Sequence, residues 1–185
     1  MSNSTEASGT SATTLLMGLV LAIAGIMGLF LVANAQDGAM AFHGYLFVAF
    51  CALGIFWMIK RHYDEAAGLV EVEGEVRYNN AVVRAGVVAS LFWGVVGFLA
   101  GLTIALQLAF PELNFHLPWT NFGRLRPVHT SAVIFAFGGN VLIATSFHVV
   151  QRTCRARLAG EWAPWFIFWG YQLFIVLAAS GYVLG

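Results

Sequence analysis

The stretch AGVVASLFWGVVGFLAGLTIALQLAFP, from Ala85 to Pro111, contains no Asp, Glu, Lys or Arg. A helix of about 20 apolar residues crosses the roughly 30 Å of hydrocarbon in a bilayer, and this run exceeds that length. Four further charge-free runs, at 7–36, 38–59, 127–151 and 162–185, also qualify once their polar ends are trimmed. Only helices satisfy every backbone group in lipid with segments of this kind. The chain is therefore predicted to be an all-α, polytopic transmembrane helix bundle with five spans.

The composition agrees with a membrane protein and excludes other classes. Of the 185 residues, 59% are hydrophobic and 10% are charged, whereas a soluble globular domain has about 25% charged residues. Nine basic residues balance nine acidic ones, so no net field favours nucleic acid as a partner. Two cysteines are too few for a disulfide scaffold. A soluble domain is excluded, and the lipid bilayer is the expected surrounding.

The basic residues divide unequally between the two sides of the predicted bundle. The loops after the second and fourth spans carry seven of them: Lys60, Arg61, Arg77, Arg84, Arg152, Arg155 and Arg157. The opposite side carries only Arg124 and Arg126. Because loops rich in Lys and Arg stay in the cytoplasm, the N-terminus is predicted to be cytoplasmic and this arginine pair to lie outside.

The distribution of polar residues suggests how the chain is divided. We expect a polar N-terminal tail at 1–12, a transmembrane hairpin at 13–60, a cytoplasmic linker at 61–80 and a three-span domain at 81–185. Within the linker, apolar and acidic residues alternate from Val70 to Val76. This alternation permits a short strand, although a solvated loop is the favoured interpretation. The last run stops at Gly185 without a basic anchor, so we expect the chain to be the front portion of a longer polypeptide.

Among the five histidines, His129 has the surroundings of a cofactor ligand. Pro127 is typical of the first position of a helix, which would place His129 in the first turn of the fourth span. Ala132 and Ala136 continue the same face and leave room for a flat macrocycle. Neutral imidazole is a good iron ligand. These features fit haem b, and the alternative is an ordinary histidine at the membrane interface.

Arg124 and Arg126 lie on the same predicted side of the membrane as His129. A haem held near the outer surface would point its two propionates toward water, and arginine offers permanently charged forks for carboxylates. The alternative interpretation is that both arginines anchor the chain among lipid headgroups.

Several sequence runs resemble a known family. They are YNNAVVR at 78–84, ALQLAFP at 105–111, TNFGRLRPVH at 120–129 and AVIFAFGG at 132–139. Together they resemble the start of catalytic subunit I of cbb3-type cytochrome c oxidases, the C-type haem-copper oxygen reductases of bacterial respiratory membranes. The resemblance covers about the last hundred residues, and the first two spans look like an N-terminal extension.

The resemblance implies specific roles for three residues. His129 would be an axial ligand of low-spin haem b, and Arg124 and Arg126 would lie near the haem propionates, with Arg126 the better candidate. The whole subunit would pass electrons from cytochrome c, through subunits that carry haem c, to a centre of high-spin haem b3 and copper. There oxygen is reduced to water and protons are pumped across the bacterial inner (plasma) membrane. The ligands of that centre and the second axial histidine of haem b lie on later helices, so no catalytic residue is assigned here.

Three other functions remain open at this point. A nitric oxide reductase large subunit has the same low-spin haem arrangement, with non-haem iron in place of copper. A two-haem electron carrier could use His43 and His129 on the outer side, and His62 and His148 on the inner side. A non-catalytic assembly protein could use its glycines only to pack helices.

Overall fold

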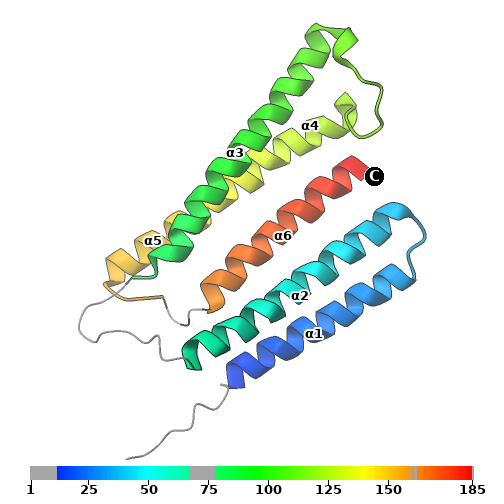
Figure 1. Ribbon diagram of the computed structural model, residues 1–185. Helices are drawn as coiled ribbons and strands as arrows, with labels where there is room; N and C mark the ends of the chain where they lie inside the picture. Colours follow the sequence, from blue (N-terminus) through cyan, green and yellow to red (C-terminus); the bar gives the residue numbers. More distant parts are fainter. Residues whose placement is uncertain (1–11, 67–77, 159, 161, 185) are drawn as a thin grey trace, which may run out of the picture. The chain divides into compact units, whose positions relative to one another are not determined.

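The computed structural model describes residues 12–66, 78–158, 160 and 162–184, and every regular element in these ranges is helical. The long helices are α1 (Ala12–Ala33), α2 (Gly38–Ala66), α3 (Asn80–Ala109), α4 (Phe122–Ser131), α5 (Asn140–Cys154) and α6 (Trp162–Leu184). A 3-10 turn, η1 (Pro111–Leu113), follows α3, and a π-helix, η2 (Ala132–Gly139), joins α4 to α5 (Figure 1). Among the residues that the structure describes, five segments are long and apolar enough to cross a membrane, with α4, η2 and α5 forming one of them. The predicted all-α fold with five spans is confirmed.

The first compact unit, Met1–Glu73, contains α1 and α2, which form an antiparallel hairpin (Figure 1). The two helices approach closely because both carry glycines at their contact. A Cβ atom on Gly44 would lie 2.6 Å from a methyl group of Val32, and one on Gly28 would lie 2.8 Å from a methyl group of Val48. Small residues of this kind let membrane helices pack backbone to backbone. Helix α2 continues to Ala66, while the alternating segment from Val70 to Val76 lies outside the described residues.

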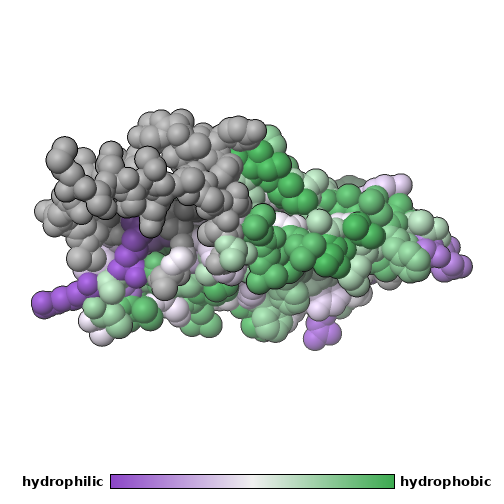
Figure 2. Space-filling model, turned by 90° about the horizontal axis from the view of Figure 1, so that it is seen from below, coloured by the Kyte–Doolittle hydropathy of each residue, from purple (hydrophilic) through white to green (hydrophobic). Residues whose placement is uncertain are grey.

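The second unit, Gly74–Gly185, contains α3 to α6. Helix α3 runs antiparallel to the continuous rod formed by α4, η2 and α5, and α6 packs beside both (Figure 1). Ala132, Ala136 and Ile175 form its buried core, and Trp93 and Tyr171 pack against them. Many large apolar side chains are instead exposed, and hydrophobic (green) residues cover much of the described surface that Figure 2 shows. This distribution is expected where lipid, rather than water, surrounds the helices.

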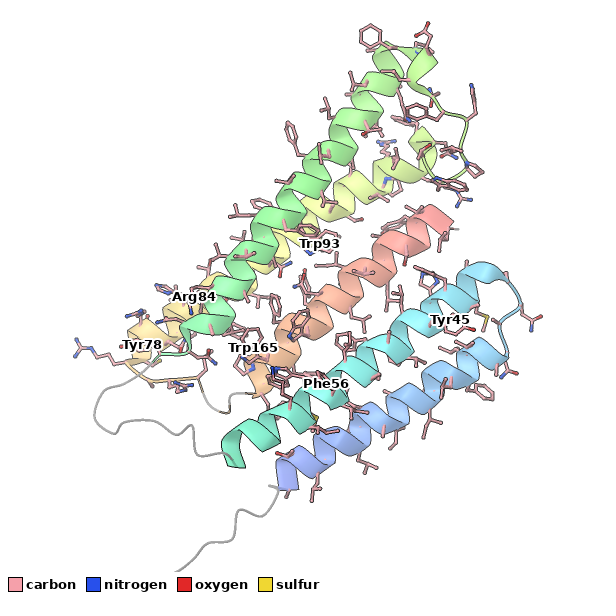
Figure 3. All side chains as sticks on the ribbon, viewed as in Figure 1. Tyr45, Phe56, Tyr78, Arg84, Trp93 and Trp165 are labelled. Atoms are coloured by element: carbon pink, nitrogen blue, oxygen red, sulfur yellow. The ribbon has the colours of Figure 1, made fainter. Side chains whose placement is uncertain are left out.

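A polar clamp joins the start of α3 to the end of α5. Gln151 is only 1% exposed, and its Oε1 accepts a hydrogen bond of 2.6 Å from the backbone N–H of Asn79. Its Nε2 donates to the carbonyl of Phe147 at 3.1 Å. Beside it, the guanidinium of Arg152 lies 4.2 Å from the centre of the Tyr78 ring, which Figure 3 labels. The clamp therefore fixes the C-terminal end of the rod, at α5, whereas His129 lies on α4 at the other end.

Candidate functional site

Helix α4, which carries His129, begins earlier than the sequence suggested. Asn121 is its N-cap, because the Asn121 side chain accepts a hydrogen bond of 2.9 Å from the backbone N–H of Arg124. A side-chain oxygen at this position satisfies a backbone donor that the helix itself cannot pair. Pro127 therefore lies inside the helix, and the expectation that it occupies the first helical position was wrong. His129 lies in the last turn of α4 instead of the first turn of the span.

The His129 ring is held against α3 by a backbone hydrogen bond. Its Nδ1 lies 2.8 Å from the carbonyl oxygen of Gly97. Because a carbonyl oxygen can only accept, Nδ1 must carry the proton, and Nε2 of the neutral ring keeps its lone pair. No described residue gives Nε2 a hydrogen bond. The imidazole is thus oriented by one nitrogen and has the other available as a ligand.

The ring fits against α3 because residue 101 is glycine. A Cβ atom at Gly101 would lie 2.6 Å from Cε1 of His129 and 2.7 Å from its Nδ1. Real Cβ atoms essentially never approach another heavy atom this closely. Gly97 and Gly101 are one helical turn apart on α3, so one supplies the hydrogen-bond acceptor and the other supplies the space. We call these two residues and His129 the imidazole niche.

The two predicted propionate-binding arginines have different environments. Arg124 is half-buried, and its guanidinium donates a hydrogen bond to the backbone carbonyl of Val183 near the end of α6. A cation at the C-terminal end of a helix is favourable because the last carbonyls there lack partners within the helix. Arg126 is exposed, and no described residue pairs with its guanidinium. Arg124 therefore ties α4 to α6, while Arg126 keeps its charge available.

Gln107 adds a polar group at the end of α3 that leads into the loop before α4. Its side chain is 3% exposed, and its Nε2 donates to the carbonyl of Thr120 at 3.0 Å. Its Oε1 has no hydrogen-bond partner among the described residues. The amide holds the connecting loop against α3 and so helps to fix where α4 begins.

The other histidines of the second unit do not join His129, and the side chain of His62, in the first unit, lies outside the described residues. His43 lies in the α1–α2 unit, and its Nδ1 is 2.7 Å from the carbonyl of Ala39, one turn earlier in the same helix. His116 and His148 are both exposed. Within the described ranges, no group of three or more His, Cys, Asp or Glu side chains could hold a free metal ion. A porphyrin brings its own four nitrogens, so one histidine is sufficient on one face of a haem iron.

The structure also reveals polar contacts that the sequence did not indicate. Trp93 Nε1 donates to Gln172 Oε1 at 2.8 Å, and Gln172 Nε2 donates to Asn140 Oδ1 at 2.8 Å, which links α3, α6 and α5 (Figure 3 labels Trp93). Asn140 is 2% exposed. Isolated polar residues within long apolar runs are the signal that could have identified them, because polar groups inside a bilayer are costly and tend to be functional.

Comparison with known proteins gives consistent matches. The family described as "Cytochrome C and Quinol oxidase polypeptide I" matches residues 81–185. A "Cytochrome c oxidase subunit 1 homolog" from Azorhizobium caulinodans is 53% identical over 173 residues, which is 91% of this chain and 31% of that protein. The "Cytochrome c oxidase subunit 1 homolog, bacteroid" from Bradyrhizobium diazoefficiens is 50% identical over 171 residues, again 91% of this chain and 31% of that protein.

A third relative is the "Cbb3-type cytochrome c oxidase subunit CcoN1" of Stutzerimonas stutzeri, 56% identical over 108 residues, or 58% of this chain and 23% of that protein. The chain thus spans about a third of the length of the two relatives that match most of it. Because those two matches cover 91% of the chain, they extend well into the α1–α2 hairpin, which the family match does not include.

Proposed function

Since the chain belongs to the family of cytochrome c and quinol oxidase polypeptide I, as its motifs predicted, we propose that it forms part of the catalytic subunit of a cbb3-type cytochrome c oxidase. In this role His129 is an axial ligand of low-spin haem b. The observation that carries the assignment is the 2.8 Å contact from His129 Nδ1 to the Gly97 carbonyl, which leaves Nε2 to bind iron.

The imidazole niche has the features of a metal-binding histidine. Such histidines almost always donate their second ring N–H to a carboxylate, a backbone carbonyl or water, which fixes the tautomer and raises the basicity of the ligand. The Gly97 carbonyl supplies that acceptor, and Gly101 leaves room for the ring beside α3. A histidine serving only as an interfacial polar residue would not need its ring to be fixed from two sides.

When bound, the haem supplies one-electron redox chemistry. The chain contributes a rigid ligand and an electrostatic field. His129 is held by α3, so the ligand geometry does not depend on a mobile loop. In this proposal the exposed guanidinium of Arg126 pairs with a propionate, and its positive charge favours the reduced state and so raises the midpoint potential. Arg124 contributes its charge from a fixed position, because it is tied to α6.

The wider assignment follows the family. Electrons arrive from cytochrome c through subunits that carry haem c, and the low-spin haem relays them to high-spin haem b3 and copper, where oxygen is reduced to water with proton pumping. The ligands of that centre are expected outside this chain. The N-terminus lies in the cytoplasm and the His129 end of the rod at the outer face of the bacterial inner membrane, which the excess of Lys and Arg in the other loops supports. The subunit names of the relatives favour oxygen over nitric oxide as the substrate.

The test is a His129→Ala substitution in the assembled, membrane-extracted complex. We expect the low-spin haem b signal to disappear from the reduced-minus-oxidised spectrum and from the electron paramagnetic resonance (EPR) spectrum. His148→Ala is the matched control. His148 lies on α5, in the same rod as His129, but its side chain is exposed. A normal low-spin signal in His129→Ala would exclude the assignment, and loss of haem in His148→Ala would instead favour a carrier with two haems. Turnover with oxygen and with nitric oxide distinguishes the oxidase from a nitric oxide reductase.

A further inference from the structure

The rod that carries His129 contains an irregular segment immediately after the niche. The π-helix η2, Ala132–Gly139, begins three residues after His129 and ends where α5 starts. π-helical turns are rare and occur mostly as short insertions, frequently at functional sites. Because their hydrogen bonds skip one residue more than those of an α-helix, they change the rotation of everything on one side of the segment relative to the other.

The π-helix is held by a tyrosine on the neighbouring helix. The hydroxyl of Tyr171, on α6, donates a hydrogen bond of 2.9 Å to the backbone carbonyl of Phe135. That hydroxyl occupies the space where a side chain at residue 139 would be, since a Cβ atom on Gly139 would lie 1.9 Å from the Tyr171 oxygen. Gly139 and Tyr171 therefore depend on each other. The missing side chain at Gly139 leaves space for the Tyr171 hydroxyl, and that hydroxyl donates a hydrogen bond to the carbonyl of Phe135.

The next carbonyl along the π-helix is held by a second route from the same part of α6. Asn140 Nδ2 donates to the carbonyl of Ala136 at 2.7 Å, and Asn140 Oδ1 accepts from Gln172 at 2.8 Å. Two consecutive residues of α6, Tyr171 and Gln172, thus act on two consecutive carbonyls of η2. In a membrane interior, where water cannot replace a lost donor, this arrangement holds the π-helix in one geometry.

We propose that Tyr171 is a positioning residue for His129, and that its hydroxyl sets the rotation of the His129 imidazole relative to the Gly97 carbonyl by holding η2 in the π conformation. Both sides of η2 are fixed independently, His129 to α3 and Asn140 to α6. A change in the winding of η2 must therefore displace one of them. Asn140 is 2% exposed and its side chain makes two hydrogen bonds, whereas the His129 ring makes one, so His129 is the side that moves. This inference rests on the proposed role of His129 as a haem ligand.

The experiment is a Tyr171→Phe substitution in the complete haem-loaded complex, which keeps the ring and removes only the donor. We expect the haem to remain bound, with shifted EPR g-values of the low-spin signal and a shifted midpoint potential, because both report the orientation of the axial imidazole. Tyr182→Phe is the matched control. It also removes a hydroxyl from α6, one that accepts a 3.3 Å hydrogen bond from Ser131 on α4, and it should leave both quantities unchanged.

A second variant tests the pairing. Gly139→Ala should shift the same two quantities, and its effect should be smaller in the Tyr171→Phe background than alone, because coupled residues do not add. Unchanged g-values and potential in Tyr171→Phe, in a complex whose low-spin signal depends on His129, would refute the positioning role alone. A low-spin signal that survives His129→Ala would refute the haem assignment and this inference with it.

Discussion

Replacing Gly101 by alanine should displace the His129 imidazole and, if His129 has its proposed role as an axial ligand, weaken the binding of low-spin haem b. The added Cβ would start 2.6 Å from Cε1, whereas ordinary contact begins at 3.4 Å, so the ring must retreat by about 0.8 Å, the difference between these two distances. Gly97 lies on the same helix, so a retreat directly away from α3 also stretches the 2.8 Å hydrogen bond to its carbonyl toward about 3.6 Å. That exceeds the normal range for a hydrogen bond.

The expected size of the effect follows from these displacements. Overpacking a well-fitted site costs about 1–3 kcal/mol, and losing an orienting hydrogen bond costs about 1 kcal/mol. Relaxation of the helix absorbs part of this, so we expect haem affinity to fall by about 2 kcal/mol. Since about 1.4 kcal/mol is a factor of ten, this corresponds to roughly thirtyfold. The figure agrees with the roughly 10–100-fold effects typical of mutating a hydrogen-bond partner behind a metal ligand.

The assay is the loss of haem from the purified complex to added apomyoglobin, followed in the visible spectrum and paired with the EPR spectrum of the low-spin haem. The matched control is Gly170→Ala on α6, where an added Cβ meets nothing within 4 Å. It should behave as the wild type. If Gly101→Ala retains haem as firmly as Gly170→Ala, with an unchanged low-spin spectrum, the ring does not lie against α3 and the niche is wrongly described.

Other predictions concern the two arginines and the polar clamp. Arg126→Leu should lower the midpoint potential of haem b with little effect on thermal stability, because its guanidinium is exposed; an unchanged redox titration would count against contact with a propionate. Arg124→Leu should instead lower the unfolding temperature of the detergent-solubilised protein, because it releases the bond from α4 to Val183; a melting curve like that of the wild type would contradict this. Gln151→Leu leaves the buried N–H of Asn79 without an acceptor and should cost about 1–3 kcal/mol of unfolding free energy, measured by denaturant titration. An unfolding free energy of Gln151→Leu equal to that of the wild type would mean that the clamp makes no net contribution to stability.

The five spans were predictable because a membrane imposes one dominant rule on the sequence. Charged side chains are excluded from the hydrocarbon, so the charge-free runs mark the helices almost directly. The same rule misplaced the start of α4. The helix begins at Phe122, ahead of Arg124 and Arg126, because Asn121 caps it there. A capping hydrogen bond depends on one side chain and leaves no mark on the distribution of charge.

The candidate site was predictable only in part, and the reason is chemical. His129 stands out as a titratable residue in an apolar run, so a sequence can nominate it. Its partner is the backbone carbonyl of Gly97, a group that every residue possesses. Gly101 and Gly139 are two of twenty glycines, and only the atoms facing them distinguish them from the rest. Tyr171 acts on a π-helix that no hydrophobic periodicity predicts. The roles of His129, Arg124 and Arg126 stay predictions until they are measured.

The packing of His129 against the helix that precedes it has a consequence for the order in which the protein is made. The acceptor at Gly97 and the space at Gly101 lie on α3, which leaves the ribosome before α4. Segments nearer the N-terminus fold first during synthesis, so the imidazole can form its hydrogen bond to the Gly97 carbonyl as soon as these two successive spans have entered the bilayer. The contacts from α6, by Tyr171, Gln172 and Val183, form later, and Tyr171 then sets the final rotation of the ring in the proposed arrangement. In the proposed haem site, the face that His129 supplies would then be prepared during translation, before α6 is in place.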